Sequence, residues 1–238
     1  MADFVQLWIY LSSTPLFGLT ATLATYVVAD ALYTHLGHAP WANPVLWSVV
    51  GIGAFLLATN TPYPKYFAGA QFVHVLLGPA VVALAWPLWQ RRAELRARGL
   101  TLIIAALVGG AAAAGSAVAL GSALGLRADI VRSLAPKSVT APVAMGIAEQ
   151  LGGIPALSAL FAVLTGVTGA LSAKYLFNWL GISDWSIRGF ALGTASHGIG
   201  AARALQVHPD AGAYAGLALG LQVLLASLLM PLVARFWP

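Results

Sequence analysis

The sequence predicts an all-α membrane protein, a polytopic bundle of transmembrane helices that includes broken or re-entrant segments. Hydrophobic residues fill 60% of its 238 positions, charged residues fill only 8%, and the mean hydropathy is +0.84. Because a soluble domain carries about 25% charged residues, most of this surface is expected to face lipid. The residue alternation of a membrane β-barrel is absent from the sequence, so the backbone is expected to pair internally as helices.

Apolar segments long enough to cross a bilayer, about 20 residues each, follow one another along the chain. The expected spans are 15–35, 44–60, 65–90, 100–124, 154–173, 186–206 and 211–234. Several tryptophans fall near the ends of these segments, as in the aromatic belts of membrane proteins. The first residues lack the basic region of a cleaved signal peptide, so we expect a multi-pass protein of the cell (inner) membrane, inserted by its own helices.

Four of the twelve basic residues lie in one short stretch. They are Arg91, Arg92, Arg96 and Arg98, interrupted by Glu94. An excess of Lys and Arg marks cytoplasmic loops, so we interpret the net charge of +5 as a signal of orientation in the membrane. The lipid bilayer is therefore an expected partner, and nucleic acid is not.

The absence of cysteine excludes disulfides and thiolate metal sites. No hydrolase triad, nucleotide-binding loop or metal-ligand spacing is visible in the sequence, and Ser158 and Ser172 have no base nearby in sequence. We therefore expect that the chain is not an enzyme and that it holds no cofactor and no metal.

Residues 126–150 are expected to form two half-helices joined by an unwound link. Pro136 and Pro142 remove two backbone donors and disfavour helix at the residues before them. This segment either crosses the membrane as a broken helix or returns as a re-entrant hairpin. The hairpin would put Lys174 and Arg235 on the side of the arginine stretch, which the positive-inside rule favours.

The unwound link carries polar side chains that suit a carboxylate. Lys137 adds a positive charge, the Ser138 and Thr140 hydroxyls add donors, and the half-helix that begins near Thr140 presents free N–H groups. Unwound backbone is tolerated at membrane depth where it lines a cavity or is buried in protein. The alternative is structural: Lys137 reaches the membrane interface, and the hydroxyls cap the half-helix.

A second polar stretch begins at Gly193. On one continuous helix, His197 would share a face with Gly193, where small neighbours let another helix or a substrate approach. His197 can titrate near neutral pH and move a proton, Arg203 can pair with a carboxylate, and Thr194 lies in the same stretch. The alternatives are a hydrogen bond from His197 to a neighbouring helix and an interfacial Arg203. His74 is a weaker candidate for the same substrate site.

Two local similarities suggest that the single transmembrane domain expected over 1–238 contains an inverted repeat. The Ser/Thr/Pro run at 12–15 resembles 138–142, and a basic residue precedes both His74 and His197 by nine positions. A linking span between two halves would reverse the direction of the second, as in secondary transporters. The expected halves and their linking span are 4–90, 127–236 and 100–124.

Small residues recur at the four-residue spacing that lets helices approach closely. The pattern comprises Gly121 and Gly125, and Gly212, Gly216 and Gly220. It indicates either a face for a homo-oligomer or ordinary packing inside the bundle, and we favour the packing interpretation.

Several of these segments together resemble the LrgB/CidB family of membrane proteins. The resemblance rests on the runs Pro136–Met145, Gly152–Pro155 and Gly193–Ala204, and on Tyr66–Ala80 in the N-terminal half. Their order and spacing cover roughly residues 50–236. Arg203 stands where the family pattern has either Lys or Arg, so this position supports only a basic requirement.

The resemblance implies two functional descriptions. One is transport of small monocarboxylates of the pyruvate, glycolate and lactate class. The other is an antiholin-like or holin-like regulator of murein hydrolase export and cell lysis, which acts through membrane oligomerisation. Both imply a small LrgA/CidA-like membrane partner as a separate chain; the plastidial glycolate/glycerate translocator resembles a fusion of the two. Polar residues at a helix break favour transport.

Overall fold

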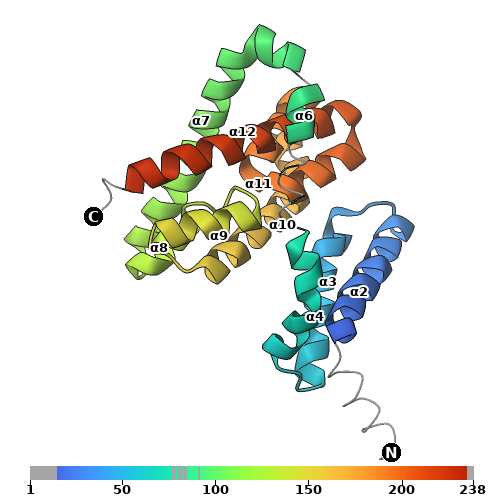
Figure 1. The fold of residues 1–238 in the computed structure, drawn as a ribbon. Coiled ribbons are helices and arrows are strands. Elements are labelled where there is room, and N and C mark those ends of the chain that lie inside the picture. Colours follow the sequence, from blue (N-terminus) through green and yellow to red (C-terminus); the bar gives the residue numbers. More distant parts are fainter. Residues whose placement is uncertain (1–14, 77–78, 80–81, 83–84, 91, 235–238) are drawn as a thin grey trace, which may run out of the picture. The chain divides into compact units, whose positions relative to one another are not determined.

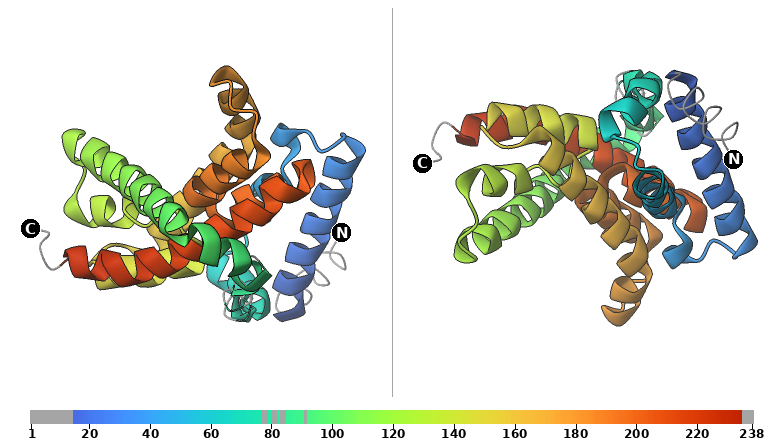
Figure 2. Two further views of the ribbon diagram at one scale, coloured as in Figure 1. Left: turned by 90° about the horizontal axis from the view of Figure 1, so that it is seen from above. Right: turned by 90° about the horizontal axis from the view of Figure 1, so that it is seen from below.

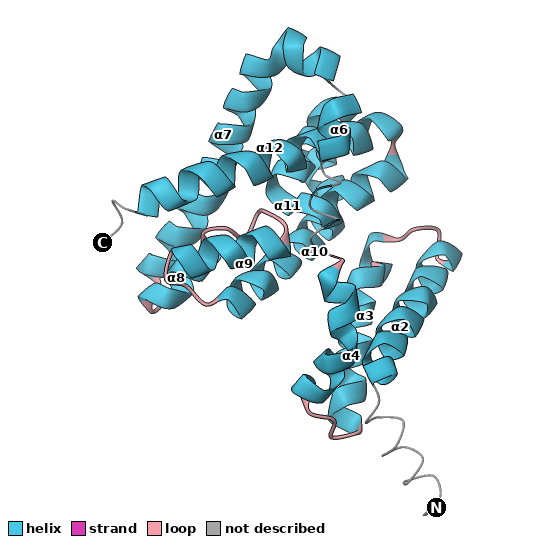
Figure 3. Ribbon diagram, viewed as in Figure 1, coloured by secondary structure: helices cyan, strands magenta, loops and turns pink. Residues whose placement is uncertain are grey.

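The computed structural model describes residues 15–76, 79, 82, 85–90 and 92–234, and within this part of the chain all regular structure is helical (Figure 3). The expected all-α class is therefore confirmed. Backbone contacts divide the chain into two compact units, Met1–Val81 and Val82–Pro238, which are described separately. The expectation of one transmembrane domain over 1–238 stays a prediction.

The first unit is built on three helices packed by small and polar contacts. Its described elements are α2 (Pro15–His35), the 3-10 turn η1 (Pro40–Ala42), α3 (Pro44–Ala58) and α4 (Tyr63–Val75) (Figure 1). α2 packs against α3 and α4, and the hydroxyl groups of Thr22 and Tyr66 are hydrogen-bonded at 2.7 Å across the α2–α4 contact. Asn43 begins α3, because its side-chain oxygen accepts two N–H groups of the first turn.

The expected spans of this unit are only partly confirmed. α2 matches the expected 15–35 and is long and apolar enough to cross a membrane. α3 has 15 residues, which is short of the roughly 20 that a span needs. The single helix expected over 65–90 is wrong, because α4 ends at Val75; Pro79 follows and disfavours helix at the residue before it. The repeat residues 12–14 lie outside the described residues.

The second unit contains the remaining spans. Its described helices are α6 (Ala85–Gln90), α7 (Arg92–Ala123), α8 (Ala128–Leu134), α9 (Ala141–Gln150), α10 (Pro155–Trp179), α11 (Trp185–Val207) and α12 (Pro209–Ala234). The lengths and compositions of α7, α10 and α12 suit a membrane span, which confirms three expected spans. Arg92, Arg96 and Arg98 of the arginine stretch belong to α7 rather than to a loop, and the non-helical Arg98 (φ −128°, ψ 18°) kinks the helix there. Arg91 lies outside the described residues.

α10, α11 and α12 form a closely packed group in the second unit (Figures 1 and 2). A Cβ atom on Gly193 of α11 would collide with the backbone of Ala215 in α12, so glycine lets the two backbones touch. The three glycines of the α12 pattern are buried within the unit, with Gly212 packed on Leu205. For α12, the packing interpretation of the small-residue spacing is therefore confirmed.

α8 and α9 confirm the broken segment expected over 126–150. α8 ends at Leu134, and α9 begins at Ala141 after the link. The Ser133 hydroxyl, at the end of α8, accepts the N–H of Ile154 at 2.7 Å, 21 residues further along the chain. The link and α9 therefore run out and back to the point where α8 ended, which agrees with the re-entrant alternative.

α11 does not cross as the straight span expected over 186–206. Its backbone leaves helical geometry at Ser196 (φ −127°, ψ 17°) and His197 (φ 41°, ψ −137°). The rings of Trp185 and His208, at its two ends, stack with their centroids 5.0 Å apart. An unbroken helix would separate these two residues by about 35 Å. The two halves of α11 therefore fold back on each other at the break, and the expected full span is wrong.

The break in α11 is held by tertiary contacts. A positive φ costs a residue such as His197 about 1–3 kcal/mol. Its ring Nε2 donates to the carbonyl oxygen of Ala162 in α10 at 2.7 Å. Gly200 lets the halves close, since a Cβ atom there would lie 3.0 Å from the Leu192 carbonyl oxygen. Because the helix turns at this point, the expectation that His197 and Gly193 share one helical face is also wrong.

Candidate functional site at two helix breaks

The depth of each break can be given by the residue of α10 that it contacts. The Ser158 hydroxyl donates to the Ala144 carbonyl of α9 at 3.3 Å, and a short turn makes α9 antiparallel to α10. Thr140, one turn before Ala144, therefore faces α10 one turn beyond Ser158, near Ala162. The His197 ring also contacts Ala162. Both breaks thus lie about 10–17 Å along a helix that is about 36 Å long.

The two re-entrant segments reach this level from opposite ends of α10. α9 ends beside the turn that leads to Pro155. Both ends of α11 lie at the other end of α10, where Arg188 donates to Asn178 at 2.7 Å and Trp185 stacks on His208. The arrangement concentrates unwound backbone in the interior of the unit, where it is tolerated in a membrane protein.

The first break carries a charge and an unpaired hydroxyl. Lys137 is half-buried and its Nζ lies 3.4 Å from the hydroxyl of the buried Ser138. Thr140 precedes α9 but its side chain does not cap the helix, and its shielded Oγ1 has no hydrogen-bond partner among the described residues. A buried unpaired hydroxyl costs about 1–3 kcal/mol. The capping alternative is therefore wrong for Thr140, and its hydroxyl is open to another acceptor or donor.

The polar side chains at the second break are hydrogen-bonded within the protein. His197 is 3% exposed, and its ring fits between Ala162 and Gly166 of α10. The structural alternative for His197, a hydrogen bond to a neighbouring helix, is thus confirmed, while its proton transfer stays a prediction. Thr194 is also buried, but its hydroxyl donates to the Phe190 carbonyl at 2.8 Å in its own helix.

The structure does not bring Arg203 to either break, and it does not place His74 relative to them. Arg203 lines a cavity of about 450 Å³ that also includes Lys174 and Arg188. His74 belongs to α4 in the first unit, and its side chain lies outside the described residues. A shared site of His74 and His197 therefore stays a prediction.

The cavity beside Arg203 was missed by sequence reasoning. Two of its basic residues, Lys174 and Arg188, flank the turn between α10 and α11, whereas Arg203 lies near the other end of α11. Asp184 caps α11 at this turn. The Ser186 hydroxyl and the N–H groups of Ile187 and Ser186 hold the pKa of the Asp184 carboxyl below its usual range.

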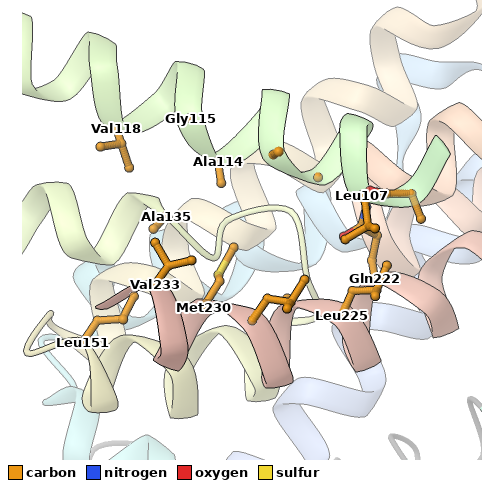
Figure 4. Close-up of a pocket in the computed structure, with 15 residues that line it drawn as sticks. Leu107, Ala114, Gly115, Val118, Ala135, Leu151, Gln222, Leu225, Met230 and Val233 are labelled. Atoms are coloured by element: carbon orange, nitrogen blue, oxygen red, sulfur yellow. The ribbon is translucent and has the colours of Figure 1, made fainter. Parts of the chain in front are cut away.

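A second cavity, of about 460 Å³, lies between α7 and α12 (Figure 4). Figure 4 shows Val118 of α7 and Met230 of α12 on its two sides, with Gln222 and Leu107 at one end. The Gln222 amide donates to the Ala106 carbonyl at 2.6 Å, and the rest of the lining is apolar. None of the predicted site residues lines this cavity.

Comparison with known proteins identifies the family. The model of the LrgB-like family matches residues 22–236. The uncharacterized protein YxaC of Bacillus subtilis is 34% identical over 212 residues, which cover 89% of this chain and 92% of YxaC. The holin-like protein CidB of Staphylococcus epidermidis is 28% identical, over 89% of this chain and 92% of that protein. CidB of Staphylococcus aureus is 28% identical over 82% of this chain and 85% of its own length.

No solved structure was found to match this chain. The family match and the YxaC alignment each extend over most of the sequence, and both include the two helix breaks. Four helices of the described residues have the length and apolar composition of a membrane span. The chain therefore belongs to the LrgB-like family and is a multi-pass protein of the cell membrane.

Proposed function

We propose that this chain moves small monocarboxylates, of the pyruvate, glycolate and lactate class, across the cell membrane. The observation that carries the proposal is the common level of the two breaks, which approach from opposite ends of α10. Secondary transporters bind substrates near the bilayer midplane at discontinuous helices. Two re-entrant segments that reach a common level along α10 would supply such a site without catalytic chemistry.

The first break suits the carboxylate end of the substrate. Lys137 supplies a positive charge, and the unpaired Thr140 hydroxyl can donate to a carboxylate oxygen. The first N–H groups of α9 have no intrahelical partners and point toward the break. Charge-assisted hydrogen bonds of this kind are about twice as strong as neutral ones.

The second break suits a coupled proton. His197 is held by one ring nitrogen, Nε2, on the Ala162 carbonyl, which leaves Nδ1 to gain or lose a proton. A histidine titrates within the physiological range more readily than any other side chain. Movement of the α11 halves would change the surroundings of His197 and so couple proton binding to substrate movement.

The arginine stretch sets the sides of the membrane in this proposal. With that stretch in the cytoplasm, α7 crosses the membrane outward. The re-entrant segment that contains α9 then enters and leaves on the outer side, and α10 crosses back inward. α11 then enters from the cytoplasmic side, and α12 crosses outward. Lys174, Arg188 and Arg203 fall on the cytoplasmic side, in agreement with the positive-inside rule. The predicted side of Arg235 concerns a residue outside the described range.

Uptake of labelled pyruvate, lactate and glycolate into vesicles that contain the purified chain tests the proposal. Lys137→Ala should lower uptake about tenfold or more, because a buried charge-assisted hydrogen bond is lost. Lys137→Arg should be partly tolerated, because a planar guanidinium is not a point charge. Lys65→Ala, at an exposed lysine of α4, is the control and should leave uptake unchanged. Full uptake by a well-folded Lys137→Ala variant would reduce Lys137 to a structural residue.

The proton role has its own test. His197→Gln keeps hydrogen bonding without titration, so uptake should lose its dependence on pH around neutrality. His35→Gln, at an exposed histidine at the end of α2, should keep the wild-type profile. If His197→Gln also keeps the wild-type profile, its hydrogen bond to Ala162 is purely structural.

The second candidate is a holin-like regulator of murein hydrolase export and lysis, which works with an LrgA/CidA-like partner. It is favoured by the comparisons, because the staphylococcal relatives are named holin-like proteins. Such a protein acts through oligomers, and neither a homo-oligomer nor a partner chain is needed for the packing described above. Co-purification with the partner and extracellular murein hydrolase activity, measured in Lys137→Ala, separate the candidates. A regulator should retain both properties when uptake is lost.

A further inference from the structure

The cavity beside Arg203 has a basic rim and an apolar floor. It lies between α10, both halves of α11 and the start of α12, and its volume is about 450 Å³. The cations on its lining are Lys174, Arg188 and Arg203, and no acidic residue of the described part of the chain lines it. Small and apolar side chains make up the floor, including Ala170, Phe177, Leu192, Ala204 and Val207.

Arg188 is fixed in place at this rim. Its Nε donates to the Ile182 carbonyl at 2.5 Å, its Nη2 donates to Asn178 at 2.7 Å, and its guanidinium stacks over the Trp185 ring at 5.0 Å. These contacts orient the guanidinium and use two of its five N–H donors. Lys174 is exposed one helical turn before Asn178. The rim therefore presents an oriented guanidinium and an exposed ammonium.

The carboxylates of Asp184 and Asp210 belong to a different pocket. Asp184 and Asp210 line a shallow pocket with Ser183, Ser186 and Tyr214, and Trp185 contributes to both pockets. Asp184 accepts hydrogen bonds at Oδ1 from the first turn of α11, so this oxygen is used in capping. The charged residues that line the cavity beside Arg203 are therefore all cations.

We propose that this cavity binds an acidic phospholipid, with the headgroup phosphate on Lys174, Arg188 and Arg203 and an acyl chain along the floor. Trp179 and Trp185 at the helix ends are typical of the membrane interface, where headgroups lie. Basic pockets between transmembrane helices suit anionic headgroups. A small carboxylate would satisfy the cations but would leave the apolar floor empty, so an amphiphile fits the whole cavity. The proposal does not depend on transport.

The lipid would also act on the second break. The cavity is lined by both halves of α11, with Arg188 from the first and Arg203 from the second. A phosphate that contacts both residues would hold the two halves together at their open end. Binding should therefore stabilise the folded-back form of α11.

Native mass spectrometry of the full chain, delipidated in detergent, tests the proposal with phosphatidylglycerol and with phosphatidylcholine as a neutral headgroup. Phosphatidylglycerol should bind preferentially, and Lys174→Gln and Arg188→Gln should each weaken it about fivefold, as expected for one cation near a headgroup. Arg127→Gln, at an exposed arginine paired with Asp129 on the α7–α8 turn, is the control and should leave binding unchanged.

Soluble competitors distinguish the source of the anion. Glycerol phosphate and pyruvate should displace the lipid only weakly, because they lack the acyl chain. Equal binding of the two lipids, or unchanged binding in Lys174→Gln, would overturn the proposal. Displacement by pyruvate at concentrations that saturate uptake would overturn it as well, because the cavity would then be a substrate site. Lys174 is exposed, so its variant remains informative if Arg188→Gln fails to fold.

Discussion

The fold-back of α11 makes a direct prediction about distance. Trp185 and His208 lie 23 positions apart, yet their rings stack with centroids 5.0 Å apart. In a straight helix the same separation would be about 35 Å. The chain contains no cysteine, so the double substitution Trp185→Cys with His208→Cys supplies its only two thiols. A bifunctional thiol reagent whose spacer is shorter than three helical turns, about 16 Å, should bridge them.

Intact mass spectrometry after treatment of the membranes reads the outcome. A bridged protein carries one reagent attached at both ends, whereas two distant thiols carry two reagents attached at one end each. The matched control is the pair Ala156→Cys and Trp179→Cys, which lies 23 positions apart on the unbroken α10. The control should carry two reagents, and the α11 pair should carry one.

Two separately attached reagents on the α11 pair, as on the control, would refute the reasoning. α11 would then cross the membrane as a straight helix, as the hydropathy of 186–206 predicts. His197 could not lie at the turn of a re-entrant segment, and the common level of the two breaks would lose its second member. Size-exclusion profiles that match the wild type exclude misfolding as the cause.

Further predictions concern packing and orientation. Gly193→Ala should lower the free energy of unfolding by about 1–3 kcal/mol, because its Cβ collides with Ala215. Gly198→Ala should leave it unchanged, because no atom lies within 4 Å of the new Cβ. Gln222→Leu should cost about 0.6–1.7 kcal/mol in a denaturation assay, because its hydrogen bond to α7 is lost. A thiol introduced by Ala93→Cys should resist an impermeant reagent in intact cells; rapid labelling would reverse the assigned orientation.

The first break could be predicted from sequence because its cause is local. Pro136 and Pro142 remove donors and bias the backbone at their own positions, whatever surrounds them. The re-entrant course of the segment was left open by sequence alone. It depends on the contact between Ser133 and Ile154, which joins residues far apart in the chain. Local chemistry thus predicts where a helix stops more readily than where the chain goes next.

The second break could not be predicted because its cause is tertiary. No proline lies between Trp185 and Val207, and the glycines there were interpreted as clearances on one straight helix. The positive φ of His197 is unfavourable in isolation. It persists because its ring reaches the Ala162 carbonyl of α10 and because Gly200 lets the halves pack. Ala162 lies 35 residues away in the chain, and Gly200 matters only because the two halves of α11 fold onto each other.

The two breaks also change where a repeat should be sought. The inverted repeat of 4–90 and 127–236 stays a prediction. The second unit alone contains a shorter structural repeat. A re-entrant segment precedes the span α10, and another precedes the span α12. The first half of α11 runs antiparallel to α10, where Arg188 meets Asn178, and parallel to α12, where Gly193 meets Ala215.

α10 and α12 therefore run in opposite directions, and each is entered from a re-entrant segment on its own side. Inverted repeats of this kind place equivalent breaks face to face near the middle of the membrane. Lys137 and His197 then occupy corresponding positions, each at the turn of its segment. One break offers a fixed positive charge and the other a titratable ring. In the transport proposed above, the charge of Lys137 would hold the anion and the ring of His197 would carry the proton.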